Sequence, residues 1–356
     1  MLKTKRQPAG KRLAPMILFL ILAVLPGFTS DFQTNLLGKF LCYAIIAVGL
    51  DLIWGYTGIL SLGHGVFFGL GAYSMAIYMT LSSTGGAMPS FMKWSGLSTL
   101  PAVWRPFANP VFAIVMAVLI PMLLALLIGF LTFRNRIKGV FFSIISQALA
   151  VIIPLLIESQ QAYTGGTNGL TNFRTLFGLN LYSHAGRLTL YYVTFAVLAL
   201  SFLFCTFLVR RRTGSILVAI RDGENRMRFT GYNPTTYKLF VYCLSAGLAG
   251  LAGALYVPQS GIISPTEMGI TPSVEMVIWV AVGGKVTLFG AVLGAVLVSV
   301  FKFVVSSNVP DAWSYIIGAV FVLVILFLPK GLMGIPEKLK SCFARRKGSP
   351  ASVVSK

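Results

Sequence analysis

Long apolar stretches separated by short polar segments run through almost the whole sequence. A helix needs about 20 apolar residues to cross the hydrocarbon layer of a membrane, and backbone groups there must be satisfied inside the protein. Each long apolar stretch therefore predicts a helix. The predicted helices cover approximately residues 13–28, 36–54, 66–81, 110–133, 139–158, 188–209, 238–258, 272–283, 288–306 and 312–328. We expect an all-α polytopic membrane protein with about ten transmembrane helices.

The eighth stretch, residues 272–283, is too short for an ordinary crossing. At 1.5 Å per residue it reaches only about 18 Å. It must extend back toward Pro265 or be part of a broken helix. Transport pathways are typically built on short helices interrupted by Gly or Pro near the middle of the membrane. Two places fit this description, residues 55–65 and the pair Gly283–Gly284.

The composition supports lipid as the main solvent of this chain. Of its 356 residues, 56% are hydrophobic and only 11% are charged, which lies far from the composition of soluble domains. The net charge of +20 does not indicate nucleic-acid binding, because the basic residues lie at the ends of apolar stretches. The sequence also has no segment long enough to form a soluble module that binds nucleic acid.

The positions of the basic residues predict the orientation. If ten helices cross the membrane, most of the 29 Lys and Arg fall on one side, in residues 1–12, 134–138, 210–238, 285 and 330–356. Basic loops mark the cytoplasmic side. We expect a bacterial inner-membrane protein with both termini in the cytoplasm.

Three parts follow from this arrangement. Residues 1–12 and 336–356 are basic cytoplasmic tails, and residues 13–335 form the transmembrane domain. The first apolar stretch follows a basic segment, as in a signal peptide, but so many later crossings favour an uncleaved helix. The four cysteines show no metal-ligand spacing, and we predict no metal site.

The cytoplasmic segment 210–237 is the longest on its side, and it mixes apolar positions with charges of both signs. A loop that only faces lipid headgroups would be basic without this mixture. A docking surface for a cytoplasmic partner explains it better. Residues 215–220 predict a short amphipathic helix, and Pro234 a new element. No GxxxxGK[ST] motif is present, so any ATPase is a separate chain.

Polar side chains at membrane depth are costly and are therefore candidates for function. Asp51 could line a path or cap backbone N–H groups, and His64 could sense pH or serve in packing. Glu275 and Lys302 could pair between helices. No HExxH motif or nucleophile with a neighbouring base is present, so we predict no catalytic residue. A channel or secondary transporter remains an alternative. The full set of these polar residues is Asp51, His64, Gln147, Glu158, Gln259, Glu275 and Lys302.

Five segments resemble the membrane subunits of branched-chain amino acid and urea ABC importers: residues 49–79, 138–149, 164–170, 220–239 and 264–295. They cover most of the chain in the family's order. SLGHGVFFGLGAY and RDGENRMRFTGYNP look closest to the UrtC type of urea permease subunit. The alternative is a LivM-type permease for branched-chain amino acids with the same architecture.

The resemblance implies a type II-like permease without catalytic activity or a cofactor of its own. Its expected partners are a homologous second permease in a heterodimer, two cytoplasmic ATPases that bind ATP, and a periplasmic binding protein. The coupling helix of the family corresponds to about residues 213–232. The predicted coupling residues are Arg221, Asp222, Glu224, Arg226, Met227, Arg228, Gly231 and Tyr232.

Urea is small, neutral and rich in N–H donors, so its path needs hydrogen-bond acceptors and small residues. An amino acid would use a path of the same architecture. The predicted path residues are Asp51, Thr57, Ser61, His64, Gln147, Thr164 and Asn168.

Overall fold

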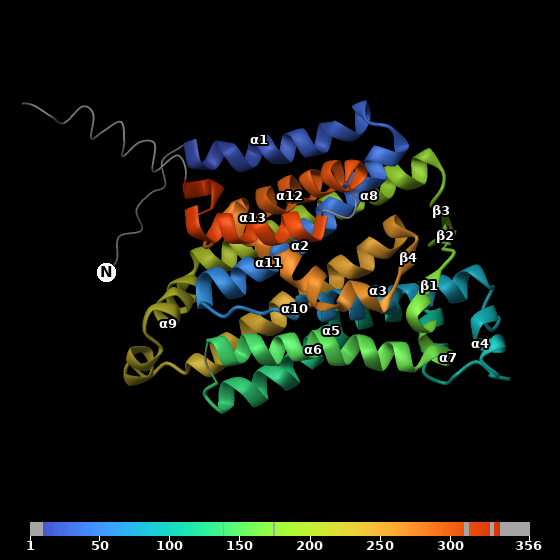
Figure 1. Ribbon diagram of the computed structural model, residues 1–356, viewed down its shortest axis with the longest axis horizontal. Helices are drawn as coiled ribbons and strands as arrows, with labels where there is room; N and C mark the ends of the chain where they lie inside the picture. The colour runs from blue at the N-terminus through green and yellow to red at the C-terminus, as the bar shows by residue number, and fades with distance from the viewer. Residues whose placement is uncertain (1–9, 138, 174, 310–312, 328–330, 335–356) are drawn as a thin grey trace, which may run out of the picture.

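The computed structural model describes residues 10–137, 139–173, 175–309, 313–327 and 331–334. Most helices run along one long axis (Figure 1). The α-helices are α1 (Gly10–Val24), α2 (Asp31–Thr57), α3 (His64–Ser83), α4 (Ser90–Trp94), α5 (Pro110–Arg134), α6 (Val140–Ser159), α7 (Gln161–Thr164), α8 (His184–Arg210), α9 (Arg212–Phe229), α10 (Pro234–Ser260), α11 (Ile270–Gly283), α12 (Leu288–Asn308) and α13 (Trp313–Phe327). The 3-10 helices are η1 (Leu25–Phe28), η2 (Arg105–Ala108), η3 (Gly166–Asn168), η4 (Pro265–Met268) and η6 (Leu332–Gly334), and the strands are β1 (Leu170–Thr171), β2 (Thr175–Leu176), β3 (Leu179–Asn180) and β4 (Ile262–Ile263).

Each of the ten predicted stretches forms a helix, which confirms the all-α polytopic class. Within the described residues, seven helices are long and apolar enough to cross a membrane: α2, α3, α5, α6, α8, α10 and α12. The helices α1, α11 and α13 are shorter, with 15, 14 and 15 residues.

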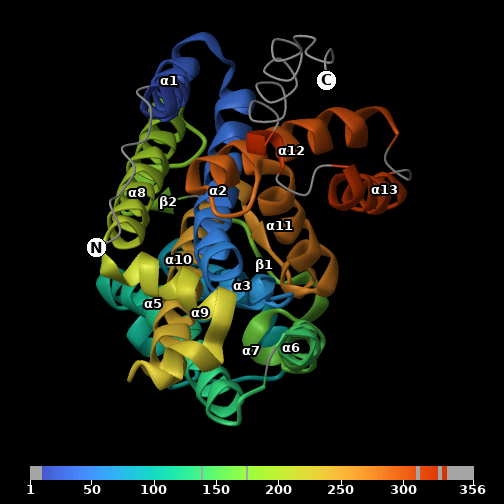
Figure 2. The same cartoon turned by 90° about the vertical axis from the view of Figure 1, so that its left-hand side faces the viewer.

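The helix α2 forms the centre of the bundle, with α8, α10, α11 and α12 around it (Figure 2). It is apolar on all sides, as expected for a buried helix. Ser30 and Gln33 begin it with a capping box, in which each side chain bonds the other residue's backbone N–H. Gly58 ends it in the left-handed conformation, with φ of 76°.

Small residues bring the helices around α2 close together. A side-chain carbon added at Gly71 of α3 would collide with the backbone of Gly250 in α10. One added at Gly250 would in turn collide with the backbone of Ala117 in α5. Close approach of this kind gives transmembrane helices their van der Waals contact where no hydrophobic effect drives association.

The basic segments between helices gather at the end of the bundle where α9 lies (Figure 1). The Thr235 hydroxyl donates to the Phe133 carbonyl at 3.4 Å, which joins the start of α10 to the last turn of α5. Arg221 of α9 donates to the Gly55 carbonyl in the last turn of α2, and Tyr56 in that turn donates to the Val286 carbonyl in the loop after α11. The opposite end holds α4, η2 and two short antiparallel pairs, β1 with β4 and β2 with β3. The tails 1–12 and 336–356 lie largely or wholly outside the described residues.

The eighth predicted stretch, residues 272–283, lies in α11, and a separate short helix precedes it. The 3-10 helix η4 ends at Met268, and α11 starts at Ile270 after Gly269. The residues before η4 are held elsewhere, because Ile263 of β4 pairs with Leu170 of β1. The chain therefore cannot continue α11 backward as one straight helix.

The segment after α8 is more helical than predicted. The expected short helix over residues 215–220 is part of α9, which spans Arg212–Phe229 and is interrupted at Gly223. The helix α10 begins at Pro234, as predicted, because proline suits the first position of a helix. The Asn233 side chain caps it by accepting from the Thr235 N–H.

Candidate functional site

The break between α2 and α3 is a non-helical stretch, residues 58–63, which we call the break segment. Two serines of α6 bind its backbone. The Leu62 N–H donates to Ser146 Oγ at 2.9 Å, and Ser143 Oγ donates to the Leu60 carbonyl at 2.8 Å. Non-helical backbone at membrane depth persists only when the protein or a water-filled cavity satisfies it. The serines of α6 meet this requirement.

Three predicted path residues, Ser61, His64 and Thr57, are buried around this break. His64 begins α3, and its Nε2 lies 2.7 Å from Ser245 Oγ of α10. This geometry agrees with a packing role for the histidine. The Thr57 hydroxyl donates to the Ile53 carbonyl at 2.6 Å, so its proton is used within α2.

Asp51 is fully buried in α2 and reaches the loop between α11 and α12. Its Oδ1 accepts the Val286 N–H at 2.8 Å. The expected alternative of capping an N–H group matches this contact, although the N–H belongs to a segment more than two hundred positions away. The tertiary structure supplied a partner that spacing along the sequence could not indicate.

Gln147 lines a groove of about 440 Å³ between α6 and the break segment. Its side chain is half-buried. Ser143 lies on the same face of α6, and Leu60 and Leu62 form the opposite wall. Of the predicted path residues, Gln147 is the one whose amide offers both donors and acceptors along this groove.

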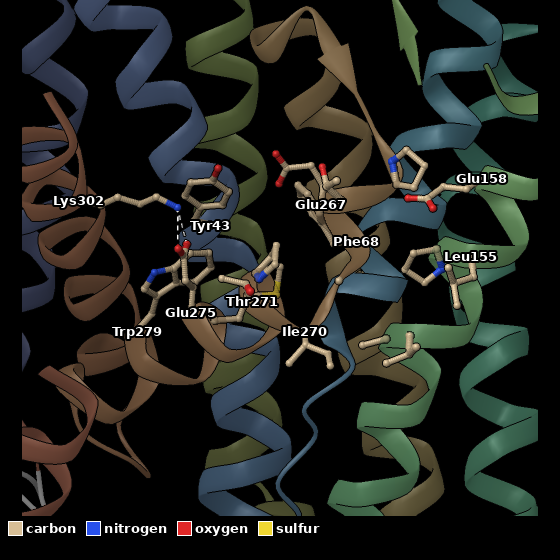
Figure 3. Close-up of a pocket in the computed structure, with 18 residues that line it drawn as sticks. Tyr43, Phe68, Leu155, Glu158, Glu267, Ile270, Thr271, Glu275, Trp279 and Lys302 are labelled. Carbon is tan, nitrogen blue, oxygen red and sulfur yellow. Dashed lines mark hydrogen bonds and ion pairs between the residues drawn. The ribbon is translucent and has the colours of Figure 1, made fainter. Parts of the chain in front are cut away.

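A larger pocket of about 700 Å³ lies between α6, η4 and α11; we call it the α6–α11 pocket (Figure 3). Three carboxyl groups line it, those of Glu158, Glu267 and Glu275. Lys302 of α12 donates to both oxygens of Glu275, at 2.8 and 2.6 Å, which confirms the predicted pair. In Figure 3, Glu158 comes from α6 on one side, and the Lys302–Glu275 pair stands on the other.

One face of α6 borders both cavities. Ser143, Gln147, Ala150, Pro154 and Glu158 follow one another at intervals of three or four residues, the spacing of a single helix face. A polar face of this kind is costly against lipid, so it borders water or protein. The other faces of α6 expose large apolar side chains such as Phe141, Ile152 and Leu156, as α5 does, which lipid-facing surfaces require.

The predicted path residues Thr164 and Asn168 lie at the end opposite α9. The Thr164 hydroxyl donates to the Ile157 carbonyl of α6 at 2.6 Å, and Asn168 is exposed in η3. The next residue, Gly169, lies directly against the backbone of Ile263, just before η4. These residues are therefore close to the η4 side of the α6–α11 pocket and far from the break segment.

The predicted coupling residues on α9 fall into two groups. Glu224 is nearly buried and accepts from Lys238 of α10 at 2.6 Å and from Arg228 at 2.9 Å. Arg221 donates to the Gly55 carbonyl of α2 and to Asp222 Oδ1, each at 2.9 Å. These contacts attach α9 to the bundle.

The second group lies on the outer side of α9 and after its end. Arg226, Gly231 and Tyr232 are exposed, and Met227 is half-buried. Phe229, which our sequence analysis did not single out, is 91% exposed beside them. Large apolar side chains exposed among charges typically mark a protein interface. Phe229 lies in the sequence between Arg228 and Gly231, outside any apolar helix face, and this position could have identified it as an interface residue.

Nothing in this arrangement resembles a catalytic or metal centre. Within the described part of the chain, no three His, Cys, Asp or Glu side chains are grouped so that they could hold a metal ion. Cys42, Cys205 and Cys243 are free thiols. What the arrangement offers is a polar helix face, two cavities along it and an exposed helix at one end.

Comparisons with known proteins agree with this picture. The family model described as branched-chain amino acid transport system / permease component matches residues 32–325. LivM of Salmonella typhimurium, a high-affinity branched-chain amino acid transport permease, is 27% identical over 96% of this chain and 79% of its own length. BraD of Pseudomonas aeruginosa is 25% identical over 83% of this chain and 92% of its own, and no solved structure matches. This chain therefore belongs to the permease component family of branched-chain amino acid transport systems.

Proposed function

We propose that this chain is the membrane-spanning permease subunit of an ATP-driven importer. The observation that carries the proposal is the face of α6 with Ser143, Gln147 and Glu158, which borders two cavities while the other faces of the helix expose apolar side chains. A small polar solute can pass along such a face without covalent chemistry. Family membership supports the same role, as the relatives are named as transport permeases.

Branched-chain amino acids are the first candidate substrates, because the curated relatives carry that name. The α6–α11 pocket fits this class. Its carboxyl groups can accept from an ammonium group, and Val151, Leu155 and Ile270 provide apolar walls for a branched side chain. Small-molecule sites typically combine such walls with a few polar groups that fix orientation.

Urea is the second candidate, favoured by the resemblance of SLGHGVFFGLGAY and RDGENRMRFTGYNP to the urea-type subunit. Urea presents four N–H donors, which carboxylates and backbone carbonyls can accept. The carboxyl groups of the pocket and the Gln147 amide suit these donors as well. The two candidates differ in the use of the apolar wall, which urea does not need.

The same proposal assigns partners to different surfaces. The α9 end, with its basic segments, faces the cytoplasm of a bacterium and receives the ATPases, while the opposite end faces the binding protein. A second, homologous permease covers the polar face of α6 and completes the path. Both termini, which flank the transmembrane domain 13–335 in the sequence, then lie in the cytoplasm.

Uptake of radiolabelled leucine and urea in cells with and without this chain tests the proposal. Loss of leucine uptake alone supports the amino acid permease, and loss of urea uptake alone supports the urea permease. Complementation with a plasmid copy controls for effects on neighbouring genes. If neither uptake changes, the importer proposal for these substrates is contradicted.

A further inference from the structure

The last turn of α2, residues 54–58, is held from one side by α9. Arg221 Nη1 donates to the Gly55 carbonyl, one of the carbonyls that the end of a helix leaves without a helical partner. A cation at this position also interacts favourably with the helix dipole. The stem of Arg221 packs so closely on Gly58 that an added side-chain carbon there would lie 2.9 Å from its Cγ.

The same turn is held from the other side by the loop between α11 and α12. The Tyr56 hydroxyl donates to the Val286 carbonyl at 3.0 Å, and the Val286 N–H donates to Asp51. Lys285 Nζ lies 3.9 Å from the centre of the Trp54 ring. The loop is thus fixed to α2 by backbone and side-chain contacts.

Val286 is strained in this position. Its φ of 66° lies in the left-handed region, which a β-branched residue adopts only when the surroundings enforce it. A side-chain carbon added at Gly55 would lie 2.7 Å from the Val286 nitrogen, so the approach of loop and helix depends on glycine. Such conformations concentrate at sites where a protein changes state.

The turn held between these two elements leads directly into the break segment. Gly58 is the left-handed cap of α2 and also the first residue of that segment. Two residues further, Leu60 is bound by Ser143 and lines the groove beside Gln147. Gly58, against which Arg221 packs, itself lines the same groove, and only one residue separates it from Leu60.

We propose that Arg221 is a positioning residue that transmits movement of α9 to the break segment, with the Lys285–Thr287 loop as the fixed side of the contact. This rests on the proposed function, in which α9 receives the ATPases. Movement of α9 shifts the Gly55 carbonyl and Gly58 through the guanidinium, and Leu60 follows because the chain between them is short.

Arginine suits this role better than lysine. Its planar guanidinium donates through Nε to Asp222 and through Nη1 to Gly55 at the same time. A lysine ammonium is a point charge on a flexible stem and does not fix two acceptors in one plane. Arg221→Lys therefore keeps the charge and removes the fixed geometry.

The test uses the assembled transporter, with both permeases, the ATPases and the binding protein, in liposomes. Leu60→Cys is introduced after the four native cysteines are replaced by alanine, and its rate of reaction with a polar maleimide is measured with and without a non-hydrolysable ATP analogue. Nucleotide should change this rate. In Arg221→Ala and Arg221→Lys the nucleotide-dependent change in labelling rate should be largely lost, and the amount of solute transported per ATP should fall.

Arg212→Ala is the matched control, because Arg212 is an exposed arginine of the same helix. It should keep both the labelling change and the transport ratio. Copurification of the ATPases with each variant separates loss of transmission from loss of docking, and Arg221→Lys covers the case in which the alanine variant does not fold. If both Arg221 variants respond to nucleotide as the parent does, the proposal is wrong. If the parent itself shows no ATP-driven transport, the proposed function fails instead.

Discussion

The contact of Glu224 with Lys238 allows a sharp prediction about α9. Both side chains are nearly buried, at 13% and 9% exposure, and their charged atoms lie 2.6 Å apart. Removing one member of a buried pair costs about 3–5 kcal/mol, because the other charge stays behind. Because both side chains keep some contact with solvent, we expect a cost at the lower end of that range. We therefore expect Glu224→Gln to weaken the attachment of α9 to α10 by about 3 kcal/mol, roughly a hundredfold in its equilibrium.

Hydrogen exchange measured by mass spectrometry in detergent tests this value. Amides of residues 212–229 should exchange up to about a hundredfold faster in Glu224→Gln, while those of α2 keep their parental rates. Asp222→Asn is the matched control: Asp222 is 63% exposed in its pair with Arg221, and such pairs are worth about 1 kcal/mol or less.

The double variant Glu224→Gln with Lys238→Met completes the test. Replacing both members of a buried pair is often close to neutral, and Arg228, the other partner of Glu224, is 29% exposed and can be solvated, so exchange in α9 should return toward the parental rate. A double variant that exchanges as fast as Glu224→Gln would refute the reasoning, as would an equal effect of Asp222→Asn.

Three further substitutions test other parts of the structure. Val286→Gly should fold and support uptake, because glycine adopts positive φ freely. Val286→Pro loses the N–H that binds Asp51. It should yield several-fold less monodisperse protein, measured by fluorescence-detected size-exclusion chromatography. Gln147→Leu should leave that elution profile unchanged and lower solute uptake about tenfold; unchanged uptake would remove Gln147 from the path. Glu275→Gln should lower the melting temperature in detergent, and adding Lys302→Met should restore it, whereas a further fall would argue against the pair.

The sequence predicted the helices well, because hydropathy and length decide which stretches cross a membrane. Residues 272–283 are too short to cross alone, and the sequence left open whether they extend back toward Pro265 or belong to a broken helix; the structure has the separate 3-10 helix η4 before α11. The short elements α4, η2 and β1–β4 were not predicted. Strands of two residues pair segments as distant as Leu170 and Ile263, and so short a run carries no periodic signal.

The site was predicted less completely, because its parts come together only in three dimensions. The pair of Glu275 with Lys302 could be anticipated from two charges of opposite sign in successive apolar stretches. The α6–α11 pocket could not, since Tyr43, Glu158 and Glu267 come from distant segments. Predicted path residues such as Thr57 and Thr164 were chosen by chemical type, and the structure shows their hydroxyl groups bonded to nearby backbone carbonyls.

The cytoplasmic segment 210–237 was also predicted only in part. Its mixture of apolar and charged residues indicated an interface, but not which side faces outward. In the structure Glu224 turns toward Lys238, and Arg221 toward the end of α2. Arg226 and Phe229 are exposed on the outer side of α9. A replacement such as Arg226→Glu is therefore expected to act on ATPase association, measured by copurification, without changing the attachment of α9 to the bundle.

The central claim, transport driven by a separate ATPase, is tested most directly by uptake into proteoliposomes. The chain is reconstituted with its second permease and its ATPases, with binding protein outside and ATP inside, and labelled leucine and urea are followed. The account predicts accumulation of one of these solutes that requires ATP, both permeases and the ATPases. Uptake by this chain alone without ATP, or no uptake of either solute by the complete assembly, would contradict it.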